Sequence, residues 1–209
     1  MQTSSLFVYT VGFIAQGFFS CRMLIQWILS EKAKKVVSPD LYWVCSLVGS
    51  ILLFVYGWLR NDFAIIFGQL ISFYIYIWNL NIKGVWHQVH LIFRIAISIL
   101  PIVAILLMLS DIPLFINNFF HNKAISLPLL IWGSIGQVIF TLRFIYQWYY
   151  SYRRGESILP LNFWIISIIG CSIIVSYGIF RLDPVLILGQ SIGFFTYSRN
   201  MILYKKNNQ

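Results

Sequence analysis

Two arginines lie in the middle of apolar segments, where a charged side chain needs a specific reason. Arg22 falls within the run Leu6–Leu29, and Arg143 falls within Leu127–Tyr150. A cation at such depth in a membrane helix costs about 2.5–3.5 kcal/mol, and neither run contains an acid. The pattern favours an anionic group supplied by a ligand, and the guanidinium fork matches phosphate oxygens. Hydrogen bonds from the arginines to helix carbonyls are the structural alternative.

Amide and aromatic side chains form two further patterns at helical spacing. Amides donate and accept hydrogen bonds, and aromatic rings offer flat apolar faces, so these stripes predict recognition of a sugar. Buried amides can equally serve to hold membrane helices together, and that alternative stays open. The two stripes are Gln69, Phe73, Tyr76, Asn79 and Gln190, Phe194, Tyr197, Asn200.

Four more residues are candidates for the same site. Gln26 and Gln147 follow the two arginines by about one helical turn, and we expect them beside the phosphate. Trp43 and Trp164 begin later apolar runs. They are interpreted either as part of the site or as aromatic residues of the membrane interface.

These candidates recur because the chain contains an internal repeat. Residues 12–80 align without a gap on residues 133–201, at a constant offset of 121, with 23 of 69 positions identical. A repeat of this length determines the architecture. On each of its helices the shared polar and aromatic residues occupy one face, and we expect these faces to point inward.

The composition is that of a membrane protein. The 209 residues are 59% hydrophobic and only 10% charged, whereas soluble domains carry about 25% charged residues. The net charge of +9 comes mostly from short basic clusters between apolar runs. This distribution fits the positive-inside rule, so nucleic-acid binding is not expected.

Seven apolar runs are long enough to cross a bilayer. Six belong to the two copies, and the seventh, Leu91–Leu109, lies between them. Basic residues follow the first run of each copy, so both copies have the same orientation, and this requires the linker to cross once more. We therefore predict an all-α polytopic membrane protein of seven transmembrane helices, with two parallel three-helix bundles joined by a linker helix.

The predicted division of the chain follows from this topology. Residues 1–80 form the first repeat, residues 81–126 form the linker with the fourth helix, and residues 127–209 form the second repeat. The N-terminus is expected outside and the C-terminus in the cytoplasm. In the outer turns, Asp62 and Asp183 are expected to pair locally with Arg60 and Arg181 at the surface.

No cofactor or metal site is expected. The three cysteines have no paired spacing. His87 and His90 lie at helical spacing beside Lys83, which is typical of a solvated inner loop. No paired carboxylates lie in the spans, so a catalytic site is not predicted.

The doubled three-helix unit resembles the PQ-loop superfamily, which includes the SWEET sugar transporters. More specifically, both copies resemble the lipid A biosynthesis N-terminal domain family. The first copy departs from that pattern at Met23, Phe63 and Trp78. The residues of the second copy that carry the resemblance are Arg143-Phe144, Gln147-Trp148, Ser151, Pro160, Phe163-Trp164, Ser167, Gly170, Tyr177, Arg181, Asp183-Pro184, Gly189-Gln190, Tyr197 and Arg199-Asn200.

This resemblance implies a bacterial inner-membrane protein linked to lipid A or related envelope glycolipids. It does not imply the lipid-A-disaccharide synthase activity that gave the family its name, since a glycosyltransferase needs a large soluble domain that these 209 residues do not supply. From the SWEET proteins it implies that Asn79 and Asn200 contact sugar. Both asparagines, however, lie nearer the inner end than a midplane site would require.

The leading hypothesis is a carrier or flippase for an anionic lipid-linked sugar or a lipid A precursor. The alternatives are an accessory or scaffold subunit of a membrane glycosyltransferase and, with less support, a membrane enzyme. Membrane lipids are expected partners in each case.

Overall fold

The computed structural model describes residues 5–110, 113, 116 and 126–207. The described part of the chain is all-helical. Its eight helices are α1 (Ser5–Ala33), α2 (Asp40–Leu59), α3 (Phe63–Ile82), α4 (Val85–Gln88), α5 (Leu91–Ser110), α7 (Leu127–Arg154), α8 (Leu161–Phe180) and α9 (Pro184–Asn207).

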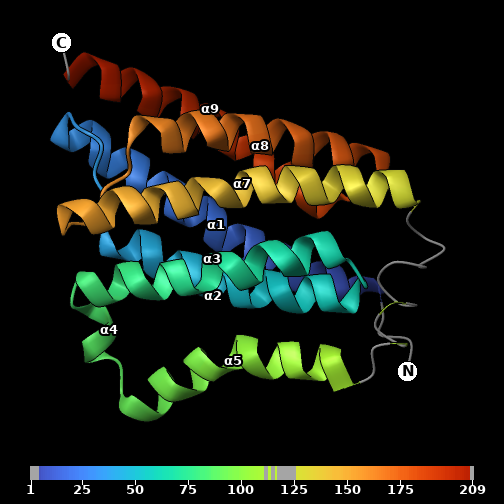
Figure 1. Ribbon diagram of the computed structural model, residues 1–209. Coiled ribbons are helices and arrows are strands. Elements are labelled where there is room, and N and C mark those ends of the chain that lie inside the picture. Colours follow the sequence, from blue (N-terminus) through green and yellow to red (C-terminus); the bar gives the residue numbers. More distant parts are fainter. Residues whose placement is uncertain (1–4, 111–112, 114–115, 117–125, 208–209) are drawn as a thin grey trace.

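Six long helices form a closed ring. Helix α1 packs on α2, α2 on α3, α3 on α7, α7 on α8, α8 on α9, and α9 again on α1. Helices α1 and α7, the first of each copy, run in the same direction (Figure 1). The two copies therefore meet along two seams, α1 with α9 and α3 with α7, and each seam joins helices that lie far apart in sequence.

The helices start and end where local sequence dictates. Pro39 and Pro160 stand in extended conformation directly before α2 and α8, as proline's missing N–H and fixed φ favour. Asp62 caps α3 by accepting a hydrogen bond from the Ile65 amide. Gly155 ends α7 in the left-handed conformation that glycine adopts without strain.

Of the seven predicted spans, five correspond to helices of the described residues that are long and apolar enough to cross a membrane: α1, α2, α3, α7 and α8. The outer surface of the ring carries large exposed apolar side chains, among them Ile14, Ile131 and Ile169. A surface of this kind suits lipid better than water. The chain is therefore a helical, multi-pass membrane protein.

The repeated faces point inward, as predicted. Arg22, Gln26, Arg143 and Gln147 are all at most 4% exposed. The largest apolar cluster draws on both copies, with Trp43 and Tyr76 from the first and Phe144 and Trp164 from the second, and it extends to Trp86 of the linker. The interior thus combines aromatic packing with an unusual share of polar side chains.

The linker lies beside the ring. Helix α4 packs on the end of α3, and α5 follows along one edge of the molecule (Figure 1). The Tyr74 hydroxyl of α3 donates a hydrogen bond to the Ser98 carbonyl of α5. Apart from residues 113 and 116, the rest of the predicted linker up to residue 125 lies outside the described residues.

Candidate functional site at the seam between the repeats

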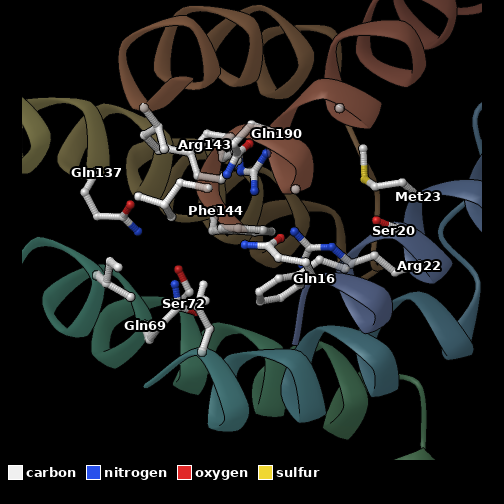
Figure 2. A pocket seen from close by; sticks show the side chains of 18 of the residues that line it. Gln16, Ser20, Arg22, Met23, Gln69, Ser72, Gln137, Arg143, Phe144 and Gln190 are labelled. Atoms are coloured by element: carbon white, nitrogen blue, oxygen red, sulfur yellow. The ribbon is translucent and has the colours of Figure 1, made fainter. Parts of the chain in front are cut away.

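A small cavity lies at the centre of the ring, between the two copies. Its volume is about 40 Å³, which is room for about three water molecules. Side chains of both copies converge on it (Figure 2), and the polar ones other than Ser20 and Ser72 occur in matched pairs. These pairs are Arg22 with Arg143, Gln16 with Gln137, Gln69 with Gln190, and Tyr76 with Tyr197.

Both arginines are held by hydroxyl groups of their own copy. Nη1 of Arg22 donates to Oγ of Ser46 at 2.8 Å and to the Tyr76 hydroxyl at 3.4 Å. Nη1 of Arg143 donates to Oγ of Ser167 at 3.3 Å and to the Tyr197 hydroxyl at 2.8 Å. The partners are neutral, so these bonds orient the guanidinium groups without balancing their charge.

Aromatic rings pack against each guanidinium group. The Cζ of Arg143 lies 3.4 Å from the ring centroid of Phe140, and that of Arg22 lies 4.5 Å from that of Phe19. Phe144 contacts both cations. These contacts supply part of the stabilisation that the desolvated charges need.

Two glycines let glutamines reach across the seams. A Cβ on Gly68 of α3 would lie 1.8 Å from Nε2 of Gln137 of α7, and one on Gly189 of α9 would lie 2.1 Å from Oε1 of Gln16 of α1. A side chain at either position would displace the glutamine amide. In each copy the glycine therefore makes room for a glutamine side chain of the opposite copy, and the glutamine that follows the glycine also lines the cavity.

Of the predicted site residues, six line the cavity: Arg22, Arg143, Gln69, Gln190, Tyr76 and Tyr197. Gln16 and Gln137 line it too, although the sequence did not single them out as site residues. Their repetition on the inward face was the available signal. Their distance from the arginines along the helix, less than two turns, could have placed them there.

Four other predicted residues form two reciprocal amide pairs that close the seams. Gln26 donates to Oδ1 of Asn200 at 2.8 Å, and Asn200 donates back to Oε1 of Gln26 at 2.9 Å. Gln147 and Asn79 exchange the same two bonds at 3.0 and 3.1 Å. All four side chains are fully buried. Each glutamine bonds an asparagine of the other copy, and none of the four lines the central cavity.

The remaining predicted residues pack in the core outside the cavity. Trp43 and Trp164 are fully buried, which does not fit an exposed interfacial belt. Nε1 of Trp43 donates to Oγ of Ser38 at 2.8 Å. Phe73 is buried in the same cluster, and Phe194 packs against it while half-buried.

The acidic residues of the outer turns correct one prediction. Asp62 and Asp183 are fully buried and do not pair locally. Arg60 pairs with Asp183 at 3.4 Å, and Arg181 with Asp62 at 3.3 Å, so each ion pair crosses between copies. The local pairing was wrong because the ring brings each turn against the opposite copy.

Tyrosines complete this outer network. The Tyr56 hydroxyl donates to Asp183 at 2.8 Å, and the Tyr177 hydroxyl donates to Asp62 at 2.8 Å. Burial acts to lower the pKa of Arg60, but Tyr56 and Asp183 more than offset this and raise that pKa above its ordinary value. Arg60 thus stays charged, and the two copies are fastened at their outer end.

Known proteins place both copies in one family. Residues 11–81 and 132–202 each match the family described as Lipid A Biosynthesis N-terminal domain. No solved structure matches the chain.

Curated relatives match almost all of the chain. It is 32% identical over 97% of its length to the lipid-A-disaccharide synthase of Chlamydia pneumoniae, and 31% identical over 96% to that of Chlamydia felis. The lipid-A-disaccharide synthase of Chlamydia trachomatis serovar D is 27% identical over 96%. The chain spans about a third of these proteins, 34% of each. With both copies matched by one domain model, the chain belongs to the Lipid A Biosynthesis N-terminal domain family.

Proposed function

We propose that the chain is a membrane carrier, or flippase, for an anionic lipid-linked sugar of lipid A or envelope glycolipid biosynthesis. The observation that carries this proposal is the pair of buried arginines at the central cavity, whose lining contains no carboxylate. A ligand phosphate would supply the missing negative charge. The lipid A connection rests on the family and on the relatives' printed name.

The proposal includes seven spans in a bacterial inner membrane. Helix α9 has a low mean hydropathy, yet its polar Gln190, Thr196 and Asn200 face the ring interior or its seams. Helix α5 would return the chain across the membrane so that both copies keep one orientation. The basic ends of α7 and α9 then face the cytoplasm, with the N-terminus outside.

Cargo passage would use the two seams. A cavity of about 40 Å³ is too small for a sugar, so the copies would have to move apart to admit the cargo. The copies would separate alternately at the amide pairs and at the outer Asp–Arg–Tyr network. Motion of one repeat against the other around a central site is the usual mechanism of repeat-built carriers.

The test is native mass spectrometry of purified protein for co-purified lipid. The proposal expects a prenyl-phosphate sugar or lipid A precursor on the wild type and its loss from a folded Arg22→Ala/Arg143→Ala variant. Arg153→Ala/Arg154→Ala is the matched control, because it removes the same amount of charge at two exposed arginines that lie away from the cavity. Lipid retained equally by all three proteins would overturn the arginine site.

A second candidate is an accessory or scaffold subunit of a membrane glycosyltransferase. It is favoured by the relatives, in which the matched region is part of a threefold longer chain named lipid-A-disaccharide synthase. This function expects a glycosyltransferase to co-purify with the chain from native membranes. It also expects both arginine variants to support glycolipid synthesis equally well once they fold.

A further inference from the structure

The two central arginines share a single aromatic ring. The Cζ of Arg143 lies 4.4 Å and that of Arg22 5.6 Å from the ring centroid of Phe144. The two Cζ atoms are therefore no farther apart than the sum of these two distances. One compact ligand group that takes the place of the ring would contact both guanidinium groups.

Both guanidinium groups keep donors free for such a ligand. In the described part of the chain, Nε of Arg22 and Nε of Arg143 are buried without a hydrogen-bond partner. The bonds described above all start from Nη1. A buried donor without an acceptor is unfavourable, and phosphate oxygens would give both Nε groups an acceptor.

The charge balance sets how many negative charges the ligand needs. Two cations with an acid-free cavity between them repel each other, and the low dielectric strengthens this repulsion. A phosphodiester brings one negative charge and leaves one arginine unbalanced. A phosphate monoester, whose second pKa is about 6, brings nearly two at pH 7, and a diphosphate brings at least two.

We propose that the site selects a doubly charged phosphate, a monoester or a diphosphate, over a phosphodiester. The inference rests on the proposed function and names the headgroup class of its cargo. The surrounding amides Gln16, Gln69, Gln137 and Gln190 would then bind the remaining oxygens or the attached sugar.

The Phe144 ring packs against both guanidinium groups and positions them at the cavity. Its counterpart in the first copy is Met23, so the pair breaks the symmetry of the cavity. The ring is 1% exposed and meets Tyr76 edge-on at 4.9 Å. A rigid ring between two guanidinium groups keeps them apart, and binding a dianion draws both toward one point.

The experiment measures binding of three farnesyl probes to the purified chain in phosphate-free detergent. The probes are farnesyl diphosphate, farnesyl phosphate and the methyl diester of farnesyl phosphate. The expected result is a preference of about tenfold or more for the first two over the diester, equivalent to about 1.4 kcal/mol. Arg22→Gln or Arg143→Gln should abolish the preference while diester binding persists.

Lysine variants separate charge from fold. Arg22→Lys and Arg143→Lys keep the charge and lose the planar fork, so the dianion preference should survive with weaker binding of every probe. Arg153→Gln should change nothing. A glutamine variant that fails to fold is replaced by its lysine partner, whose loss of the preference would overturn the charge count.

The pH dependence of probe binding provides an independent readout, since the phosphate of farnesyl phosphate itself changes charge with pH. Lowering the pH from 7.5 to 5 protonates farnesyl phosphate to a monoanion, so its advantage over the diester should disappear. No carboxylate or histidine is among the described residues that line the cavity, so the change of charge in this range is that of the probe. The titratable groups that face the arginines are the phenols and thiols of Tyr42, Tyr76, Tyr197, Cys45 and Cys171.

The outcomes distinguish this inference from the proposed function. Equal binding of all farnesyl probes would overturn the dianion selection and leave the anionic-lipid carrier standing. No binding of any probe would overturn both. Inorganic diphosphate that binds as tightly as farnesyl diphosphate would uphold the dianion site and overturn its lipid-linked source.

Discussion

The two seams of the ring share an amide pair and differ in the side chains directly beside it. Each seam is closed by a Gln–Asn amide pair. Beside the pair on the α1–α9 seam, Arg199 forms an ion pair with Glu31, which also accepts a bond from Trp27. Beside the pair on the α3–α7 seam, Trp148 packs on Trp78 and Tyr152.

Repeat counterparts make this difference informative. Trp27 and Trp148 are equivalent, while Glu31 corresponds to Tyr152 and Arg199 to Trp78. An ion pair on one seam and an aromatic group on the other thus occupy equivalent positions and hold the two helices together by different interactions. The buried amide pair has no such freedom, because each amide needs a partner of matching shape.

The largest expected effect is a loss of stability on removing an aspartate of the outer ion pairs, and it should differ between the two pairs. Asp62→Ala should destabilise the chain by about 3–5 kcal/mol, because it leaves a buried arginine unpaired. Asp183→Ala should cost less. Its partner Arg60 is 20% exposed and keeps a bond to the Tyr9 hydroxyl at 2.9 Å, whereas Arg181 is 7% exposed and keeps a longer bond to the Tyr177 hydroxyl at 3.3 Å. Denaturant unfolding in detergent measures both, and equal losses would contradict this ranking.

The amide pairs should behave alike on both seams. Gln26→Leu and Gln147→Leu should each cost about 1–3 kcal/mol, since each removes two hydrogen bonds between buried amides. The double variant Gln26→Leu/Asn200→Leu should recover part of this loss, because it removes both polar partners. A double-mutant cycle on each seam gives the coupling energy, and a coupling near zero on either seam would rule out a shared fastening.

The two core tryptophans give a smaller difference. Nε1 of Trp43 donates to Ser38, but Nε1 of Trp164 is buried without a partner among the described residues, because Leu159 stands where the first copy has Ser38. Trp43→Phe should therefore cost about 1 kcal/mol more than Trp164→Phe, the value of one hydrogen bond. Comparing the two unfolding midpoints checks this, and the reverse order would refute it.

The smallest effect concerns the parts of the seams that differ. The partly exposed Glu31–Arg199 pair should contribute little to stability, and its contribution should weaken with salt. Exchanging Glu31→Tyr and Arg199→Trp together should leave the stability nearly unchanged and remove that salt dependence. Unfolding at low and high salt tests the exchange, and a large loss of stability would show that the seams are not interchangeable.

The sequence predicted the helices and several of the residues that line the central cavity. Apolar runs located the helices, the repeat indicated two equivalent units, and the shared faces identified the inward side. Arg22 and Arg143 were recognised because a charge in an apolar helix is costly wherever the helix packs. These features depend on local spacing and composition, so no tertiary information was needed.

Partner choice depended on the tertiary structure. In a repeated chain, Asp62 has two chemically identical partners, Arg60 in its own turn and Arg181 in the other copy. The same ambiguity affects Gln26, which could have faced Asn79 or Asn200. The pairings with Arg181 and Asn200 arise because the ring closes through α1–α9 and α3–α7. A sequence with internal symmetry leaves that choice open, and only the packing of the two copies decides it.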